Sequence, residues 1–362
     1  MPRLLMTVAA ALLMACTAAG QELLWSVDYS TVLNNREGGD GETPDQTFFF
    51  ARVSPEIGVG LMNGRHQLKG GVSWYQPIND DWDGYKLHPT LYYTYTRRHW
   101  RMAAGAMPRT LLRERLPLYL WSDSMAYRQP NVRGALVQYT AGPSYWQMAL
   151  DWRQMQSATR REAFNAIFSG RWHPGRRAAW LGGYLQYNHL AKRKDAPADE
   201  GVNDDVTVNP LVGIDLSRHT ALDSLAFSAG AVVQMQRARS EGKWHTPCAF
   251  VASATAQWRW LGITEQVKAG KDLYPLYDRF GSELNMGDPY YRHKFYSRTD
   301  IWARIVGTRF ADVRTTLSFH TTGDGTFGFW QQVAVRFYID NAVWSHRRNP
   351  KWLQRHKLGN TY

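Results

Sequence analysis

The stretch "CAFVASATAQWRW", from Cys248 to Trp260, carries an apolar side chain at every second position. The apolar set is Phe250, Ala252, Ala254, Ala256, Trp258 and Trp260, and the polar set between them is Ser253, Thr255, Gln257 and Arg259. Successive side chains of a strand point to opposite faces, so this pattern predicts one strand with an apolar and a polar side. A soluble sheet turns the apolar side toward a dry core, whereas a membrane barrel turns it toward lipid and lines a lumen with the polar side.

The same alternation recurs over 206–216, 225–235 and 329–339. These runs cover about nine to thirteen residues, which matches a tilted membrane-crossing strand better than the shorter strands of soluble domains. Long polar connections alternate with short ones of a few residues, and the long ones lie near 34–46, 79–86, 110–131, 154–161, 190–205, 237–247, 271–294 and 321–326. The sequence therefore predicts an all-β protein: a transmembrane, antiparallel, up-and-down barrel of about 16 strands, with long outer loops and short periplasmic turns.

The first twenty residues differ from the rest of the chain. Arg3 is followed by an apolar run from Leu4 to Ala15 and by small residues before Gln21, which predicts a secretory signal peptide over 1–20. "LMAC", ending at Cys16, loosely resembles a lipoprotein box, but we favour ordinary cleavage because a membrane-embedded barrel gains little from a lipid anchor. Cleavage leaves Cys248 as the only cysteine and excludes an internal disulfide. We expect a barrel over 21–340 and a basic periplasmic tail over 341–362.

Aromatic residues lie near the ends of the predicted strands, where an apolar ring meets lipid and a polar edge meets water. Together with the strand and loop pattern, this arrangement resembles the outer-membrane porin-like β-barrels of Gram-negative bacteria, over roughly residues 23 to 340. The resemblance rests on architecture and not on a short motif. It implies a location in the cell outer membrane, contact with outer-membrane lipid and a homotrimeric assembly.

Strand parity assigns more basic than acidic side chains to the interior. The predicted lumen and constriction residues are Arg101, Arg109, Arg113, Arg115, Arg153, Arg171, Arg259, Arg298, Arg304 and Arg314. Fewer acids share this parity, namely Glu56, Asp151, Asp215, Asp300 and Asp312, and some of these could simply neutralise neighbouring arginines. Cations along a narrow aqueous path concentrate anions, so the sequence predicts a lumen that prefers acidic solutes.

Two long loops contain aromatic and charged residues. In porin-type barrels the third outer loop, here 110–131, folds into the lumen, and its Tyr119, Trp121, Asp123 and Tyr127 are our candidates for solute binding. A loop that only packs on the rim is the alternative. Loop 271–294 has scattered acids without the spacing of a calcium loop, and tyrosines suited to a glycan; we expect it to be a solvated lid without a ligand.

The function predicted from the sequence is passive or selective diffusion of small solutes, anionic or saccharide in character. The first alternative is a non-conducting, lectin-like barrel that binds acidic polysaccharide on its outer loops. A third is an outer-membrane hydrolase, for which His320, Ser318 and Asp312 share one inward parity, but no hydrolase motif is present. We therefore expect no enzyme, no catalytic residues, no metal and no cofactor. Nucleic acid is not expected as a partner despite the formal net charge of +12, because that charge is dispersed through an exported β chain.

Overall fold

The computed structural model describes residues 21–345, except 38–42, 44, 79, 177, 198–199 and 218. The predicted signal peptide and most of the predicted tail, residues 346–362, lie outside the described residues and stay predictions. No helix within the described ranges is long and apolar enough to cross a membrane.

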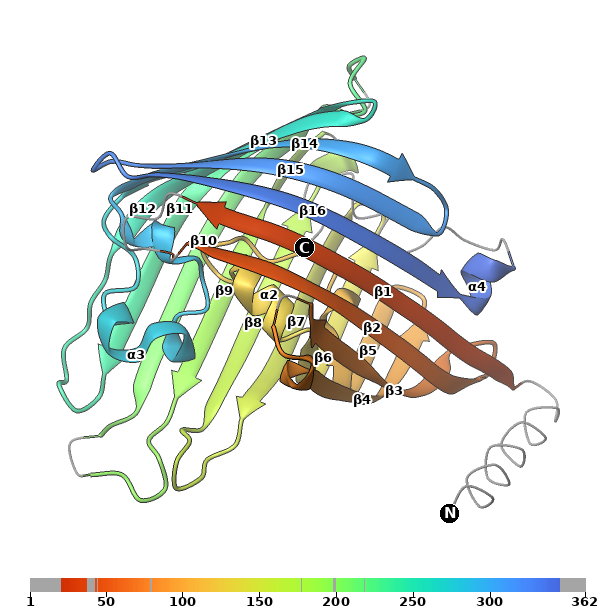
Figure 1. Ribbon diagram of the computed structural model, residues 1–362, viewed down its shortest axis with the longest axis horizontal. Coiled ribbons are helices and arrows are strands. Elements are labelled where there is room, and N and C mark those ends of the chain that lie inside the picture. The colour runs from red at the N-terminus through yellow and green to blue at the C-terminus, as the bar shows by residue number, and fades with distance from the viewer. Residues whose placement is uncertain are drawn as a thin grey trace.

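Sixteen antiparallel strands form one closed barrel in which each strand pairs with its neighbours in sequence and β1 pairs with β16 (Figure 1). The strands are β1 (Glu22–Glu37), β2 (Gln46–Leu61), β3 (His66–Pro77), β4 (Lys86–Arg97), β5 (Trp100–Pro108), β6 (Asn131–Ala141), β7 (Ser144–Gln154), β8 (Ala163–Trp172), β9 (Ala179–Leu190), β10 (Asn203–Asp215), β11 (Ser224–Ala238), β12 (Cys248–Trp258), β13 (Leu261–Gly270), β14 (Phe295–Gly307), β15 (Ala311–Thr322) and β16 (Phe327–Asp340). Closure removes the exposed sheet edges that a bilayer would not tolerate. The predicted fold class and strand number are confirmed.

Strand β12 answers the question raised by residues 248–260. Phe250 and Trp258 are 52% and 53% exposed, whereas Val251 and Thr255, on the other face, are 4% and 9% exposed. Large apolar side chains are likewise exposed on the outside of other strands, for example Leu91, Val212 and Ile305. An apolar exterior around a polar interior is the arrangement that a bilayer requires, and the barrel is therefore a protein of the outer membrane.

The connections divide the barrel into two ends. Short turns join β2 to β3, β4 to β5 and every later even-numbered strand to the next, and both ends of the strand set, Glu22 and Asp340, lie at this short-turn end. The other connections lie at the opposite, long-loop end, and most of them are long. The prediction of a long connection near 321–326 is wrong, because β15 continues to Thr322 and β16 begins at Phe327. By the rule for outer-membrane barrels, short turns face the periplasm and long loops face outward. A short helix, α4 (Asn341–Trp344), follows β16 at the short-turn end, where Asp340 accepts a hydrogen bond from the Val343 amide at 2.7 Å.

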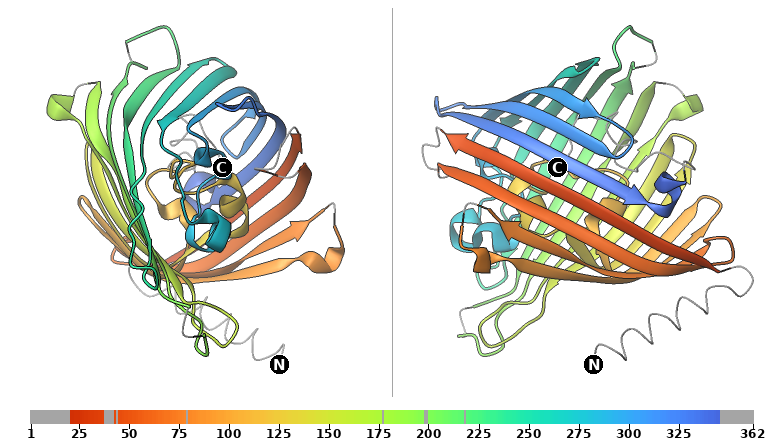
Figure 2. Two further views of the ribbon diagram at one scale, coloured as in Figure 1. Left: turned by 90° about the vertical axis from the view of Figure 1, so that its left-hand side faces the viewer. Right: turned by 45° about the vertical axis from the view of Figure 1, so that its right-hand side comes forward.

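Small helices lie in connections of both kinds: η1 (Trp82–Gly84) lies in the connection after β3, and η3 (Pro174–Arg176) lies in the short turn between β8 and β9. The loop after β5, which we call loop 3, contains η2 (Arg109–Leu111) and α2 (Asp123–Arg128). The loop after β13, which we call loop 7, contains α3 (Tyr277–Leu284) and η4 (Pro289–Arg292). Figure 2 shows both loops within the ring of strands, with α3 nearer the long-loop end.

Candidate functional site

Loops 3 and 7 fill the outer half of the lumen with an apolar core, and we call them together the plug. Their buried side chains pack against inward-facing wall residues from several strands, including Ile167, Trp180 and Trp330. The buried plug residues of this cluster are Leu116, Leu118, Tyr119, Leu120, Trp121, Met125, Leu273, Tyr274, Met286, Tyr290 and Tyr291. Loop 3 folds inward as expected. The prediction of a solvated lid over 271–294 is wrong, because burial of its apolar and aromatic side chains in the lumen removes them from water.

The two loops are joined to each other by backbone contacts. The Ser122 amide donates to the Met286 carbonyl at 2.8 Å, and the Asp288 amide donates to the Leu118 carbonyl at 2.8 Å. Close approach requires Gly287, since a Cβ there would lie 2.0 Å from the Tyr274 hydroxyl oxygen. The loops therefore form one body rather than two independent lids.

Loop 7 is anchored to the wall by neutral amides. Its Tyr274 amide donates to Oε1 of Gln234 at 2.6 Å, and its Leu276 amide donates to Oε1 of Gln236 at 3.1 Å. The Gln234 amide group in turn donates to the buried carboxylate of Asp205 at 3.0 Å. These bonds satisfy loop backbone groups that would otherwise be buried without partners.

Loop 3 is anchored by charges. Asp123, at the start of α2, forms ion pairs with Arg115 of the same loop and with Arg298 of β14, the latter at 3.1 Å. Arg36 of β1 donates to the Ser124 hydroxyl at 3.1 Å. Burial tends to raise the pKa of Asp123, but the three guanidinium groups outweigh it and hold that pKa below its ordinary value. The carboxylate is therefore ionised at neutral pH.

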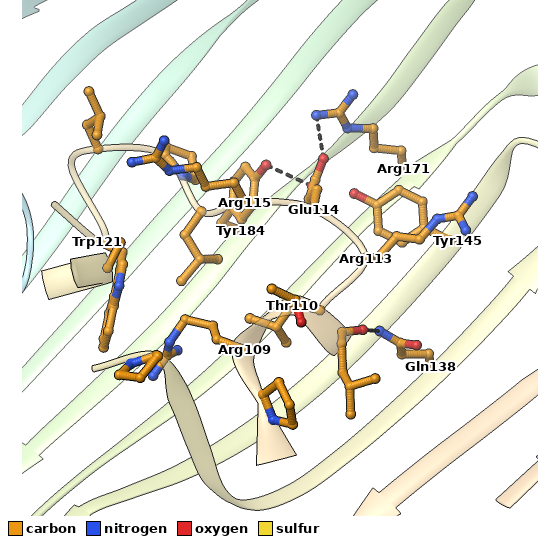
Figure 3. A pocket seen from close by; sticks show the side chains of 18 of the residues that line it. Arg109, Thr110, Arg113, Glu114, Arg115, Trp121, Gln138, Tyr145, Arg171 and Tyr184 are labelled. Carbon is orange, nitrogen blue, oxygen red and sulfur yellow. Dashed lines mark hydrogen bonds and ion pairs between the residues drawn. The ribbon is translucent and has the colours of Figure 1, made fainter. Parts of the chain in front are cut away.

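A cavity of about 980 Å³ lies in the lumen toward the short-turn end, where it is lined by residues of the short turns such as Arg98 and Pro143. Figure 3 shows part of its lining. Nine basic side chains line it, namely Arg52, Lys69, Arg98, Arg101, Arg109, Arg113, Arg115, Arg171 and Arg336. Of the carboxylates in the described part of the chain, only four line it, namely Asp28, Glu56, Glu114 and Asp215. The excess of basic side chains makes the cavity attractive to anions.

One side of the cavity combines charge with aromatic rings. Glu114 accepts from Arg171 at 2.6 Å and from the Tyr184 hydroxyl at 2.8 Å, as Figure 3 shows. The Arg171 guanidinium also lies 4.4 Å from the centre of the Trp180 ring. Arg113 is different: it is exposed in the cavity, lies 5.6 Å from the centre of the Tyr145 ring, and forms no ion pair within the described part of the chain. Arg113 is thus available to an anionic solute.

Eight of the residues predicted for the site line this cavity: Arg101, Arg109, Arg113, Arg115, Arg171, Tyr119, Trp121 and Tyr127. Asp123 lies above it in the plug. Arg153, Arg298, Arg304 and Arg314 belong to inward-facing positions outside the cavity. There Arg298 pairs with Asp300 and Arg304 with Asp312, as Arg109 does with Asp151, so part of the basic wall is neutralised.

One placement is wrong. Arg259 does not face the lumen; it lies in the turn after β12, at φ 53°, with its guanidinium 4.9 Å from the centre of the outward-facing Trp258 ring. The alternation of a strand does not continue through a turn. The sequence pattern predicts a connection over 34–46, but β1 continues to Glu37, and for this reason parity does not identify Arg36 as a lumen residue. Extending the alternation of Ser30, Val32 and Asn34 by one step would have found it.

The closed sixteen-strand barrel, its apolar exterior and its inward-folded third loop define an outer-membrane β-barrel with the fold of porins. The chain belongs to the family described as lipid A 3'-O-deacylase-type, whose model matches residues 16–292. No curated protein matches the sequence significantly.

Solved structures share the fold at low sequence identity. OpdK of Pseudomonas aeruginosa with vanillate aligns at a TM-score of 0.52 and 10% identity, covering 88% of this chain and 99% of that one. OprD of the same organism aligns at a TM-score of 0.53 and 10% sequence identity, and the alignment covers 90% of this chain and 98% of that one. OccK2 (OpdF) of P. aeruginosa in complex with glucuronate aligns at a TM-score of 0.50 and 9% sequence identity, and the alignment covers 89% of this chain and 98% of that one. These likenesses show the fold of outer-membrane porins.

Proposed function

We propose that the protein is an outer-membrane channel for small anionic or saccharide solutes, in which the cavity holds the solute and the plug moves aside to let it pass. The observation that carries this proposal is the excess of basic side chains in the cavity, with Arg113 free of any ion pair in the described ranges. Aromatic rings such as Tyr145 and Trp180 beside the cations suit a solute with a ring or a sugar face. The vanillate and glucuronate bound by two structures of the same fold are ring-bearing carboxylates, which supports this solute class.

The test is ion preference in planar lipid bilayers under a salt gradient. We expect Arg113→Gln and Arg101→Gln to lower the anion-to-cation permeability ratio several-fold, because each removes a positive charge from the cavity wall. Arg259→Gln is the matched control, since it removes the same charge from a turn beside the lipid-facing Trp258. An unchanged ratio in the cavity variants, or an equal change in the control, contradicts the proposal.

The structure buries most of the loop 7 tyrosines on which a lectin-like function would depend. Of the tyrosines in loop 7 that could have presented a glycan-binding face, Tyr274, Tyr290 and Tyr291 are buried in the plug, and Tyr290 is fully enclosed. A non-conducting barrel would give no current steps in bilayers even when the plug is weakened. The homotrimer is a separate prediction, and the mass of the detergent-solubilised protein tests it.

The family match over residues 16–292 favours one second candidate, a deacylase that removes an ester-linked acyl chain from lipid A. The hydrolase residues considered from the sequence do not support it. His320 is fully buried with Nδ1 2.8 Å from the Tyr296 hydroxyl, and Asp312 pairs with Arg304 at 2.6 Å, so neither forms a relay to Ser318. Mass spectrometry of lipid A from cells that express the protein decides between the two. We expect an unchanged acyl pattern; loss of one acyl chain would establish the deacylase instead.

A further inference from the structure

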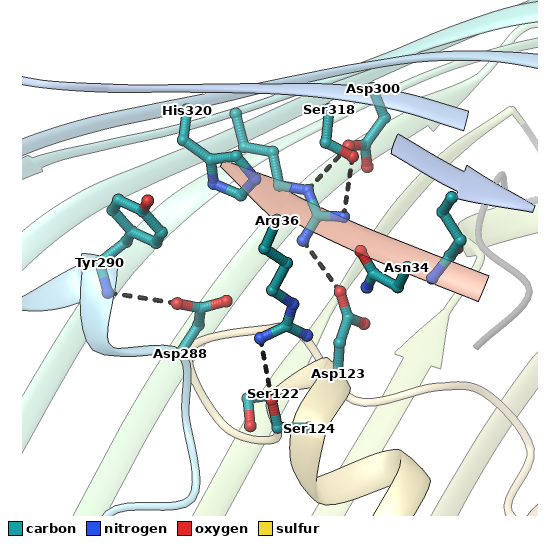
Figure 4. Close-up of polar contacts among 12 residues, drawn as sticks. Asn34, Arg36, Ser122, Asp123, Ser124, Asp288, Tyr290, Asp300, Ser318 and His320 are labelled. Atoms are coloured by element: carbon teal, nitrogen blue, oxygen red, sulfur yellow. Dashed lines mark hydrogen bonds and ion pairs between the residues drawn. The ribbon is translucent and has the colours of Figure 1, made fainter. Parts of the chain in front are cut away.

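Three arginines from different parts of the chain surround the carboxylate of Asp123. We call Arg36 of β1, Arg115 of loop 3 and Arg298 of β14 the arginine trio. Arg115 contacts Oδ1 of Asp123, and Arg298 contacts Oδ2 at 3.1 Å. In Figure 4, Arg36 lies between Asp123 and Asp288, and it donates to Ser124, the residue after Asp123. The carboxylate of Asp123 in loop 3 thus lies in a receptor to which the barrel wall contributes Arg36 and Arg298.

The trio offers more hydrogen-bond donors than Asp123 uses. Nε and Nη2 of Arg36 and Nε of Arg115 are buried and have no hydrogen-bond partner among the residues that the structure describes. Nε and Nη2 of an arginine form the edge that binds a carboxylate with two parallel hydrogen bonds. Arg36 is only 6% exposed and is held between the rings of Phe48 and Trp330, so this edge is fixed in place. Unfilled, fixed donors of this kind are a binding capacity for an anion.

The receptor adjoins the solute cavity. Arg115 lines the cavity from loop 3, as do Trp121 and Tyr127 on either side of Asp123 in sequence. A carboxylate that enters the cavity therefore contacts Arg115 first, and Arg298 and Arg36 lie deeper in the plug, beyond Arg115. Removing Asp123 without replacement would leave buried cations unpaired, which is strongly unfavourable, whereas exchanging one carboxylate for another keeps the charges matched.

We propose that Asp123 is an internal stand-in for the carboxylate of the transported solute. A solute carboxylate takes over Arg115 and Arg298, Asp123 is released, and α2 loses its ionic anchor to the wall and swings out of the lumen. This inference rests on the proposed channel function and deepens it: it names the ligand group as a carboxylate and makes binding of that group the event that opens the plug. Neutral solutes of the same size do not open it.

The test uses single-channel recording with glucuronate and with glucose as its neutral counterpart. We expect glucuronate, but not glucose, to raise the open probability of the unmodified protein about tenfold or more, because a hydrogen bond to a charged group contributes enough free energy to change an equilibrium by that factor. Asp123→Asn keeps the shape but removes the charge, so it opens without solute and no longer responds to glucuronate. Asp312→Asn is the matched control, because it neutralises a lumen carboxylate that pairs with Arg304 of the wall strand β14; it keeps the response.

A measurement on the unmodified protein keeps the proposal testable if Asp123→Asn does not fold. Hydrogen exchange of residues 115–128 should become faster with glucuronate and not with glucose. Equal responses to the two solutes, or equal behaviour of Asp123→Asn and Asp312→Asn, overturn the inference. Anion-preferring current that is insensitive to glucuronate overturns this inference alone, whereas absence of any current, even in plug-weakened variants, overturns the channel function.

Discussion

Leu284→Ala should weaken the plug without damaging the barrel. Leu284 ends α3 and is 0% exposed; it packs with Leu276 and Phe280 of the same loop against Ala163, Leu190 and Ala238 of the wall. Truncation of a fully buried leucine to alanine costs about 2–5 kcal/mol, because it loses the transfer free energy of the side chain and leaves a cavity. The hydrogen bonds between strands do not involve this side chain, so the substitution lowers the free energy with which loop 7 docks on the wall and leaves the barrel itself intact.

The expected effect on gating follows from that free energy. About 1.4 kcal/mol corresponds to a tenfold change in an equilibrium, so even a cost of about 2 kcal/mol raises the ratio of open to closed plug about 30-fold. Single-channel recording in planar bilayers measures this ratio directly. Leu185→Ala is the matched control, because Leu185 lies on the outer face of β9 and is 43% exposed. We expect no change in its open probability.

Two results would refute this reasoning. One is an open probability of Leu284→Ala equal to that of the unmodified protein while circular dichroism shows an intact barrel. The plug would then not be what closes the lumen. The other is an equal rise in the Leu185→Ala control, which would mean that general loosening of the barrel, rather than undocking of loop 7, opens the path.

Two further predictions concern the lipid face and pH. Ala252→Arg places a charge on the outer face of β12 near mid-strand and should lower the free energy of unfolding in lipid by about 2–4 kcal/mol. Ser253→Arg, at the next position and facing the cavity, should lower it far less. Urea titrations measure both values, and equal losses contradict the assignment of faces. Burial raises the pKa of Asp288 in loop 7 to about 6 even though Arg298 and Arg36 lower it. The docked loop therefore binds a proton more tightly than a released one with the ordinary value of 3.8, and docking strengthens as pH falls through 6. Lowering the pH from 7.5 to 5 should reduce the open probability about tenfold, and Asp288→Asn should abolish that contribution; an undiminished pH response in Asp288→Asn assigns it to other groups.

The barrel could be predicted from the sequence because the physical constraint acts on every strand separately. Each strand must show lipid an apolar face and the lumen a polar one, so the alternation seen from Phe250 to Trp258 repeats wherever the chain crosses. The alternation of long and short connections adds the strand number and the end at which both termini of the barrel lie.

The plug could be predicted only in part. The inward course of loop 3 was predicted from the resemblance to porin-type barrels. The hydrophobic pattern of residues 271–294 does not indicate that loop 7 also folds into the lumen. Burial of Tyr274 and Tyr290 depends on the space left inside a closed barrel by other segments, which is a tertiary property. The pairing of Asp123 with Arg298 spans 175 positions in the chain and has no local signal. Parity predicted that Arg298 faces the lumen, but it could not show that Arg298 pairs with Asp123 of loop 3.

The most direct test of the account is the reversal potential of the Leu284→Ala barrel in a potassium chloride gradient. An apolar exterior encloses a wet interior whose cavity is lined by more basic than acidic side chains. We therefore expect a reversal potential of the sign set by chloride. A potential of the sign set by potassium, or no current at all from a correctly inserted barrel, contradicts it.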